Sequence, residues 1–470
     1  RGDIEVHWWV ANDPEMRTVI GRGSVVTNSA RDFTVKVEAS SLRPGTTYYY
    51  QFSGLDVPSP IGRTKTLPVG DIDSVRLAVV SCSNLPHGYF NVYRCLAQRP
   101  DLDAVLHLGD YLYEYKNGQD GDGTALNRVP MPDKEIVTLQ DYRIRHAQYK
   151  ADLDSQAMLR QHPLIAVWDD HESANDSWMD GAENHDPDQG EGDWLKRRTA
   201  SVKAYYEWMP IRENRSAQQL QIYRSFRFGD LVDLIMLDTR LTGRDEQVDR
   251  DNNLAVQDSN RSLLGDTQEA WLFGELEESM KNGTQWRVLG QQVFFGAQAP
   301  RDEIRNSDKW DGYQGNRNRI FDFIEKHTLE NLVVVTGDIH SSWALDVPRD
   351  PWGAYDSTTG LGSLAVEFVT PAVSSPSQFT TRPEEADAAH QARMVASPHL
   401  KFVDQVHRGY FILDITPERA QADWYFVSTV ATRSTAQRFI RGFYTSAGSN
   451  HLTEATRPMA SRPDVPLLAP

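Results

Sequence analysis

The chain has few cysteines, no long apolar run and a deficit of basic residues. Its 470 residues include two cysteines, Cys82 and Cys95, which excludes a disulfide network but leaves one bridge open. Apolar stretches such as residues 332–335 are far shorter than the roughly 20 residues that cross a bilayer. The 49 Lys and Arg against 66 Asp and Glu give a formal net charge of -17. This charge disfavours nucleic acids and anionic membrane surfaces as partners.

The remaining composition is that of a folded globular protein. Hydrophobic residues make up 39% and aromatic residues 10%, which excludes wholesale disorder. The length allows more than one domain. The sequence opens at Arg1 without a charged and then apolar leader, so we expect that any export signal was removed or never present.

Residues 1–67 differ from the rest, because short alternating segments without a helical period predict a small antiparallel β unit. Its clearest feature spans residues 42–52, where Pro44 and Gly45 form a turn and Tyr48, Tyr50 and Phe52 share one strand face. This segment resembles the tyrosine corner of fibronectin-type sandwiches. A complete sandwich needs more chain, so one or two opening strands are expected to be missing or supplied otherwise.

From residue 72 onward, continuous apolar runs alternate with helical stretches, as in an α/β protein with buried parallel strands. Asp193 is predicted to cap a helix that ends at Pro210, and Asp266 with Glu269 to form a capping box. We expect a catalytic domain over residues 72–430 and a C-terminal extension over 431–470. The predicted strands are residues 75–80, 104–108, 164–168, 231–237, 286–289, 332–335, 364–369 and 410–415.

Potential metal ligands follow several of these runs directly. In an open α/β sheet the carboxyl ends of the strands border the ligand crevice, so side chains far apart in sequence can converge there. Each signal alone is weak, since a buried Asp is usually ion-paired and a buried Cys is usually inert. Several carboxylates at one crevice would repel each other unless cations neutralise them. The residues concerned are Cys82, Asp110, Tyr113, Asp170, His171, Asp238, Gln291, Asp338 and His340.

The motifs Ser-Cys82, Gly-Asp110-Tyr-Leu-Tyr113, Trp-Asp-Asp170-His-Glu and Thr-Gly-Asp338-Ile-His340 occur in this order along the chain. Together they resemble the PhoD family of alkaline phosphatases and phosphodiesterases, which includes a secreted phospholipase D. The resemblance implies a four-layer α/β/β/α metallophosphoesterase domain and a site similar to that of purple acid phosphatases, with iron and calcium. It also implies secretion or periplasmic residence.

Under this resemblance the donors divide between two kinds of ion. The Cys82 thiolate, the Tyr113 phenolate and the His340 imidazole suit Fe(3+), with Asp110 as a bridge to a second ion. Asp170 and Asp338 offer the hard oxygen ligands that Ca(2+) prefers. Asn175 and Gln291 are further candidates for binding metal or phosphate, with a structural role as the alternative for each.

The expected activity is hydrolysis of small-molecule phosphate monoesters, and also of diesters, by a metal-activated hydroxide or oxide. His171 is a candidate to stabilise phosphate or protonate the leaving group, with a supporting role as its alternative. Arg240 is a candidate phosphate clamp, and an ion pair with Asp238 is the alternative. Two other functions stay open: a phospholipase D acting on phospholipid, and a non-catalytic, calcium-dependent binding protein.

Overall fold

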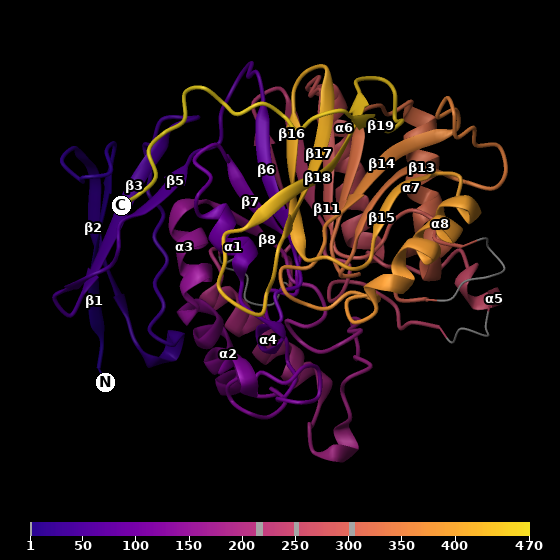
Figure 1. The fold of residues 1–470 in the computed structure, drawn as a ribbon. Coiled ribbons are helices and arrows are strands. Elements are labelled where there is room, and N and C mark those ends of the chain that lie inside the picture. Colours follow the sequence, from indigo (N-terminus) through magenta and orange to yellow (C-terminus); the bar gives the residue numbers. More distant parts are fainter. Residues whose placement is uncertain (1, 213–219, 249–252, 300–305) are drawn as a thin grey trace.

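The computed structural model describes residues 2–212, 220–248, 253–299 and 306–470. Its strands form three sheets, a five-stranded one near the N-terminus and two seven-stranded ones (Figure 1). None of the helices in the described part of the chain is long and apolar enough to cross a membrane.

The N-terminal sheet is antiparallel throughout and has the order β2-β1-β3-β4, with β5 also paired to β3. Tyr48 is buried in β3, and its hydroxyl accepts a hydrogen bond from the Arg43 backbone N–H at 2.8 Å. All strands described within residues 2–68 belong to this one sheet. They are β1 (Ile4–Ala11), β2 (Val19–Thr27), β3 (Thr47–Gly54), β4 (Val57–Pro58) and β5 (Gly62–Lys65).

The second sheet has the order β19-β18-β17-β16-β6-β7-β8. β6, β7 and β8 are parallel, whereas β16 to β19 are antiparallel, so the sheet is mixed. Residues 437–446 and 453–455 supply its last two strands. The bounds are β6 (Val75–Val80), β7 (Ala104–His107), β8 (Leu164–Ala166), β16 (Gly409–Ile415), β17 (Arg419–Val427), β18 (Gln437–Ser446) and β19 (Thr453–Ala455).

The third sheet has the order β15-β13-β14-β12-β11-β10-β9. Its four central strands β10, β11, β12 and β14 are parallel, and β9, β13 and β15 are antiparallel. The bounds are β9 (Arg224–Phe228), β10 (Val232–Met236), β11 (Trp286–Gln291), β12 (Leu332–Thr336), β13 (Ser342–Pro348), β14 (Ser363–Val369) and β15 (Leu400–Asp404).

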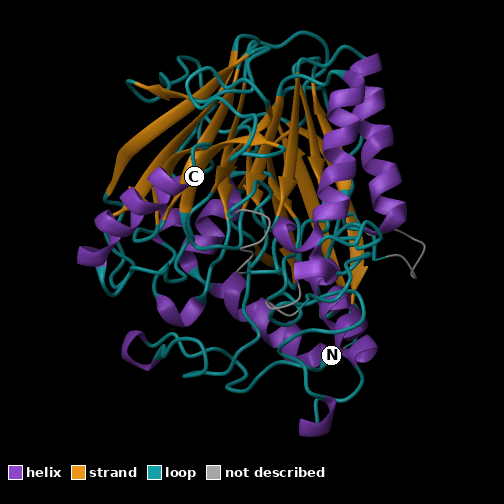
Figure 2. Cartoon of the chain, turned by 90° about the vertical axis from the view of Figure 1, so that its right-hand side faces the viewer, coloured by secondary structure: helices purple, strands orange, loops and turns teal. Residues whose placement is uncertain are grey.

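Helices flank the strands (Figure 2). Of the two predicted N-terminal caps, one forms and one does not. Asp193 caps α4 as predicted, because its side chain accepts the Lys196 backbone N–H at 3.2 Å. The predicted capping box at Asp266 is wrong: α6 begins at Gly265, and Glu269 instead binds α7. The helices are α1 (Asn91–Leu96), α2 (Leu139–Ala151), α3 (Leu153–Gln161), α4 (Trp194–Trp208), α5 (Asn253–Val256), α6 (Gly265–Lys281), α7 (Gln314–His327) and α8 (Ala386–Ala396).

The largest hydrophobic cluster contains side chains of both seven-stranded sheets, among them Val79 and Phe411 from one and Val335 and Phe368 from the other. A second cluster joins the third sheet to α6 and α7. Burial of these apolar faces against each other is the main favourable term that holds the two sheets together. The shared core brings the carboxyl ends of β6 to β8 close to those of β10 to β12.

Candidate metal centre

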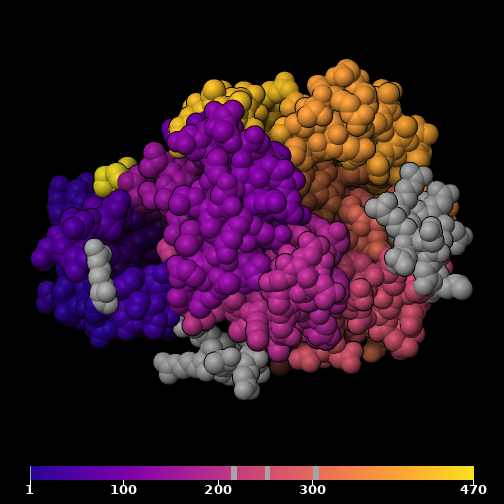
Figure 3. All heavy atoms as spheres, turned by 90° about the horizontal axis from the view of Figure 1, so that it is seen from below, coloured from indigo at the N-terminus to yellow at the C-terminus, as the bar shows by residue number. Residues whose placement is uncertain are grey.

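The loops that follow the parallel strands of both sheets meet at one edge. The Gln292 side-chain amide donates to the carbonyls of Trp168, after β8, and Leu237, after β10, at 2.9 Å each. Gly337 approaches Ser81 so closely that a Cβ on it would lie 3.0 Å from the serine Cβ. Figure 3 views the molecule from below, where magenta segments of the first half of the chain border orange segments of the second.

One group of candidate ligands at this edge consists of Cys82, Asp110 and His340, whose donor atoms all lie within 4.8 Å of one another. Tyr113 joins them. Its hydroxyl lies 3.1 Å from Asp110 Oδ2 and 3.1 Å from His340 Nε2, and it accepts a hydrogen bond from Ser375. The structure therefore brings together a sulfur, a phenol oxygen, a carboxylate and an imidazole from four separate loop positions. Both cysteines are free and buried, so Cys82 is not half of a disulfide.

Two further groups share members with the first. Asp110, Asp170 and His171 form one, and Asp169, Asp170 and Asp338 form the other, each again within 4.8 Å. Asp110 thus belongs to the sulfur-containing group and also to the neighbouring carboxylate group. A side chain in that place can bridge two ions.

The backbone at these positions is unusual. Cys82, Asp110, Asp338 and His340 have φ angles of 62°, 53°, 62° and 54°. Residues with a Cβ rarely adopt this left-handed region, which costs roughly 1–2 kcal/mol per residue. Such strain persists where the surrounding structure imposes it, and it is concentrated at functional sites. Four strained candidate ligands in one cluster point to a site that the fold holds in place for a purpose.

Two carboxylate oxygens in the cluster are buried without a hydrogen-bond partner among the described residues, Asp110 Oδ1 and Asp169 Oδ2. A buried unpaired polar atom costs about 1–3 kcal/mol, and more when it is charged. The cluster therefore fits cations, because both oxygens belong to residues of the candidate ligand groups and a bound cation would satisfy each of them.

The electrostatics also require positive charge. Burial raises the pKa of the Cys82 thiol, the Asp110 carboxyl and the Tyr113 hydroxyl. Burial likewise raises the pKa of Asp338, to about 6. Ionisation of all these groups at once needs a compensating cation.

Arg240 supplies part of that charge. Its guanidinium is fully buried and donates to Asp169 at 2.5 Å, Asp308 at 2.7 Å and Asp338 at 3.1 Å. Burial opposes ionisation of Asp170, but Arg240 and His171 outweigh it and lower the pKa of Asp170 to about 2. The alternative for Arg240, an ion pair with the Asp238 side chain, does not form; Asp238 Oδ1 accepts the backbone N–H groups of Arg240 at 2.8 Å and of Leu241 at 3.0 Å.

His171 stacks on the Tyr113 ring at 4.1 Å between centroids, and its Nδ1 lies 2.7 Å from the buried Glu114 carboxylate. Burial opposes protonation of His171, but Glu114 and the nearby aspartates outweigh it and raise the pKa. Asn175 lies on the outer side, where its side-chain amide donates to Glu183 at 3.1 Å. Gln291 is inside the core, bonded to Thr336 and Trp310.

Comparisons with known proteins agree with this fold and with the cluster. Residues 77–424 match the family of PhoD-like phosphatases, and residues 1–68 match the N-terminal domain of PhoD-like phosphatases. The chain belongs to the PhoD-like phosphatase family. It is 36% identical over 436 residues to alkaline phosphatase D of Bacillus subtilis (strain 168), covering 90% of this chain and 71% of that one. A solved structure of PhoD superposes with a TM-score of 0.86 at 32% identity, over 97% of this chain and 86% of that one.

The family indicates phosphoester hydrolysis, small-molecule substrates and dependence on metal. In this PhoD-like phosphatase, several residues outside the predicted ligand set contact the cluster. Glu172 accepts three backbone N–H groups from the ligand loops, Glu114 holds His171, and Asp169 and Asp308 bind Arg240. Asp169 and Glu172 stand in the motif that follows the predicted strand 164–168, and Glu114 directly follows Tyr113, so position alone could have singled them out. No local pattern marks Asp308.

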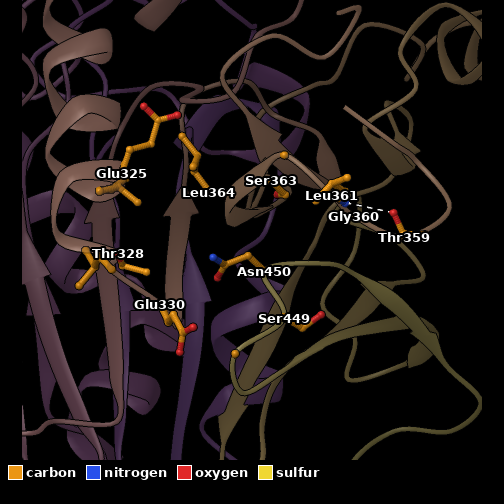
Figure 4. A pocket seen from close by; sticks show the side chains of 14 residues that line it. Glu325, Thr328, Glu330, Thr359, Gly360, Leu361, Ser363, Leu364, Ser449 and Asn450 are labelled. Carbon is orange, nitrogen blue, oxygen red and sulfur yellow. Dashed lines mark hydrogen bonds between the residues drawn. The ribbon is translucent and has the colours of Figure 1, made fainter. Parts of the chain in front are cut away.

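A pocket of about 600 Å³ lies elsewhere, at the amino ends of β12 and β14 and so opposite the cluster (Figure 4). Glu325, Glu330 and Asn450 project around it. None of the described residues that line it is an arginine or a lysine. An acidic lining of this kind is a poor site for a phosphate group.

Proposed function

We propose that this PhoD-like phosphatase hydrolyses phosphate monoesters, and also diesters, at a centre that holds iron and calcium. One observation carries the proposal: in the same cluster, four non-glycine candidate ligands have left-handed backbone, and two buried carboxylate oxygens have no hydrogen-bond partner in the described part of the chain. The alternatives of a phospholipase D and of a non-catalytic binding protein have no comparable support, because the relative with the matching sequence is an alkaline phosphatase.

The donor chemistry supports two kinds of ion. Cys82, Tyr113 and His340 would hold Fe(3+), Asp170 and Asp338 would hold Ca(2+), and Asp110 would bridge them. When bound, such cations would offset the charge of the phosphoryl oxygens and activate the attacking water.

The protein's own side chains would set the rest of the chemistry. Glu114 occupies His171 Nδ1, which leaves Nε2 as the ring nitrogen that can donate a proton to a phosphoryl oxygen or to the leaving group. Arg240 is enclosed by carboxylates, which favours charge balance of Asp169, Asp308 and Asp338 over a direct clamp on phosphate. Asn175 would act through the loop after β8, which its backbone N–H ties to the Glu114 carboxylate of the loop after β7 at 2.7 Å.

The test combines metal analysis with turnover of p-nitrophenyl phosphate and its bis-p-nitrophenyl diester. We expect iron and calcium in the purified protein, and loss of both activities on chelation. Asp170→Asn should abolish turnover and calcium binding, whereas Asp188→Asn on an exposed loop should change neither. Full activity in exhaustively metal-free protein would overturn the proposal.

We also propose that β6 to β17, which belong to the two seven-stranded sheets, and the helices between them form the four-layer α/β/β/α domain over residues 72–430. The hydrophobic core shared by the two sheets supports this domain, and Phe443 and Leu452 of residues 431–470 also belong to that core. Residues 1–67 would be an incomplete fibronectin-like unit, for which the Arg43–Tyr48 hydrogen bond is the support. Residues 431–470 would form a C-terminal extension that adds strands to the second sheet. Secretion or periplasmic residence is proposed from the family, and fractionation of the source cells would test it.

A further inference from the structure

The loop of residues 117–123, which follows Tyr113 and Glu114, is tied to itself and to the neighbouring 84–87 segment. Within the loop, Asn117 accepts the Gly123 backbone N–H at 2.8 Å, and the Gly118 N–H donates to the Gly121 carbonyl at 2.9 Å. Gly121 has a φ of 87° and sits so close to His87 that a Cβ would lie 2.7 Å from its Nε2. The loop is therefore closed by its own hydrogen bonds and packs through Gly121 against His87.

Asp120 is the side chain that this loop presents to the 84–87 segment. Its Oδ2 accepts the Asn84 side-chain amide at 2.8 Å, and its Oδ1 lies 3.4 Å from His87 Nε2. Asn84 is two residues beyond Cys82 and is buried, with its carbonyl bound by Ser374. These contacts fix the Asp120 carboxylate against the segment that follows the candidate ligand Cys82.

The same carboxylate is open to solvent. The Asp120 side chain is 38% exposed. Cys82, Asp110 and Tyr113 are buried, whereas Asp338 and His340 are partly exposed, so solvent reaches the centre from the side of these two residues.

The charge of Asp120 acts on that open side. Burial lowers the pKa of His340 to about 4, and the Asp120 carboxylate is one of the groups that oppose this shift. Burial opposes ionisation of Asp120, but His87 outweighs it and lowers the pKa, so the carboxylate is ionised at neutral and alkaline pH.

We propose that Asp120 is a specificity-determining residue. Its fixed negative charge on the solvent-exposed side of the candidate metal centre disfavours doubly charged phosphate monoesters relative to singly charged diesters. The inference rests on the proposed function. A phosphate monoester has its second pKa near 6 and is a dianion at alkaline pH, whereas a diester carries one charge. A like charge at the rim of a site penalises the dianion more, and it acts mainly on binding.

The experiment compares p-nitrophenyl phosphate with methyl p-nitrophenyl phosphate, which share a leaving group and differ by one methyl group and one charge. For Asp120→Asn we expect kcat/KM for the monoester to rise about threefold to tenfold, mostly through KM, and that for the diester to change less than about twofold. In the wild type, added salt should raise the monoester-to-diester ratio by screening, and Asp120→Asn should abolish that dependence.

Asp122→Asn is the matched control, because Asp122 lies in the same loop and is exposed, and its Oδ1 binds Asn117 and Thr124 instead of the 84–87 segment. It should leave the ratio of the two substrates unchanged. An unchanged ratio in Asp120→Asn, equal losses on both esters, or the same shift in Asp122→Asn would each overturn the inference. A wild-type protein that hydrolyses neither ester would instead overturn the proposed function.

Discussion

Glu172 is the residue whose replacement tests most directly how the candidate metal centre is held. It sits two positions after Asp170, and its buried carboxylate links the loops that follow β7 and β8. Oε2 accepts the backbone N–H groups of Asp110 at 3.0 Å and Asp169 at 2.7 Å, and Oε1 accepts that of Tyr111 at 2.5 Å. The side chain thus fixes the backbone of two candidate ligand loops without facing the substrate.

The hydrogen bonds set the size of the effect. In Glu172→Gln the amide nitrogen must face at least one backbone N–H, so one bond is lost and two donors oppose each other. A buried donor without a partner costs about 1–3 kcal/mol, and bonds to a charged acceptor are the stronger ones. We therefore expect a loss of about 2–3 kcal/mol in the free energy of unfolding for Glu172→Gln, and about 4–6 kcal/mol for Glu172→Ala, which leaves three donors unpaired.

Urea unfolding, metal content and turnover of p-nitrophenyl phosphate would be measured side by side. Asp346→Asn is the matched control, because Asp346 is also fully buried and accepts from Leu452, Tyr355 and His451, but in β13 away from the cluster. Both variants should lose stability, and Glu172→Gln alone should also lose metal and at least about tenfold in turnover, as expected when a supporting contact of a metal site is removed. Equal retention of metal and activity in the two variants would refute a positioning role for Glu172.

Three further perturbations have defined outcomes. Tyr113→Phe removes one oxygen that contacts Asp110 and His340, so the visible absorption expected of an Fe(3+) phenolate should shift or vanish and activity should fall. Tyr115→Phe is the control. Unaltered colour and turnover in Tyr113→Phe would show that Tyr113 only packs. A calcium-selective chelator should remove activity quickly while iron remains bound, and added calcium should restore it; unchanged turnover after calcium removal would contradict the roles of Asp170 and Asp338. Burial lowers the pKa of His162 to about 4 from its ordinary 6.5. As the pH falls, the unfolded chain therefore binds the proton before the folded chain does. The free energy of unfolding should consequently drop by about 1.4 kcal/mol per pH unit between pH 6.5 and pH 4. His162→Asn should flatten this slope in unfolding experiments; an equally steep slope would show that other groups cause it.

Local pattern was enough to find the strands that position the centre. The apolar runs at 75–80 and 332–335 correspond to β6 and β12 within one residue, because a buried strand is a continuous apolar segment. The candidate ligands after them could be predicted for the same reason: strand ends are visible in sequence and meet at one edge. Pairing partners are not visible. β16 has the same apolar pattern as a parallel strand, yet it runs antiparallel to β6.

The supporting contacts could not be predicted, because they depend on residues far apart in the chain. Arg240 follows Asp238 closely in sequence, yet its partners Asp169, Asp308 and Asp338 lie 71, 68 and 98 positions away. Glu269 has the spacing of a capping box with Asp266, but Asn316 and Arg319 of α7 bind it instead. In each case a tertiary ion pair prevails over the short-range alternative, since a buried charge must find its strongest available partner.

The environment of Arg240 bears on how many cations the centre can take. Arg240 faces the carboxylates of Asp169, Asp170, Asp308 and Asp338, and Arg244 also pairs with Asp308, so four carboxylates face two guanidinium groups. Arg240 alone therefore cannot stabilise the ionised cluster, which explains why burial still raises the pKa of Asp338 with the guanidinium 3.1 Å away. The guanidinium nevertheless occupies one side of Asp338 permanently. A cation held by Asp170 and Asp338 would share Asp170 with the group of Asp110, Asp170 and His171, and Asp110 in turn belongs to the group of Cys82 and His340. The two proposed ion sites would therefore be neighbours joined through Asp110 and Asp170.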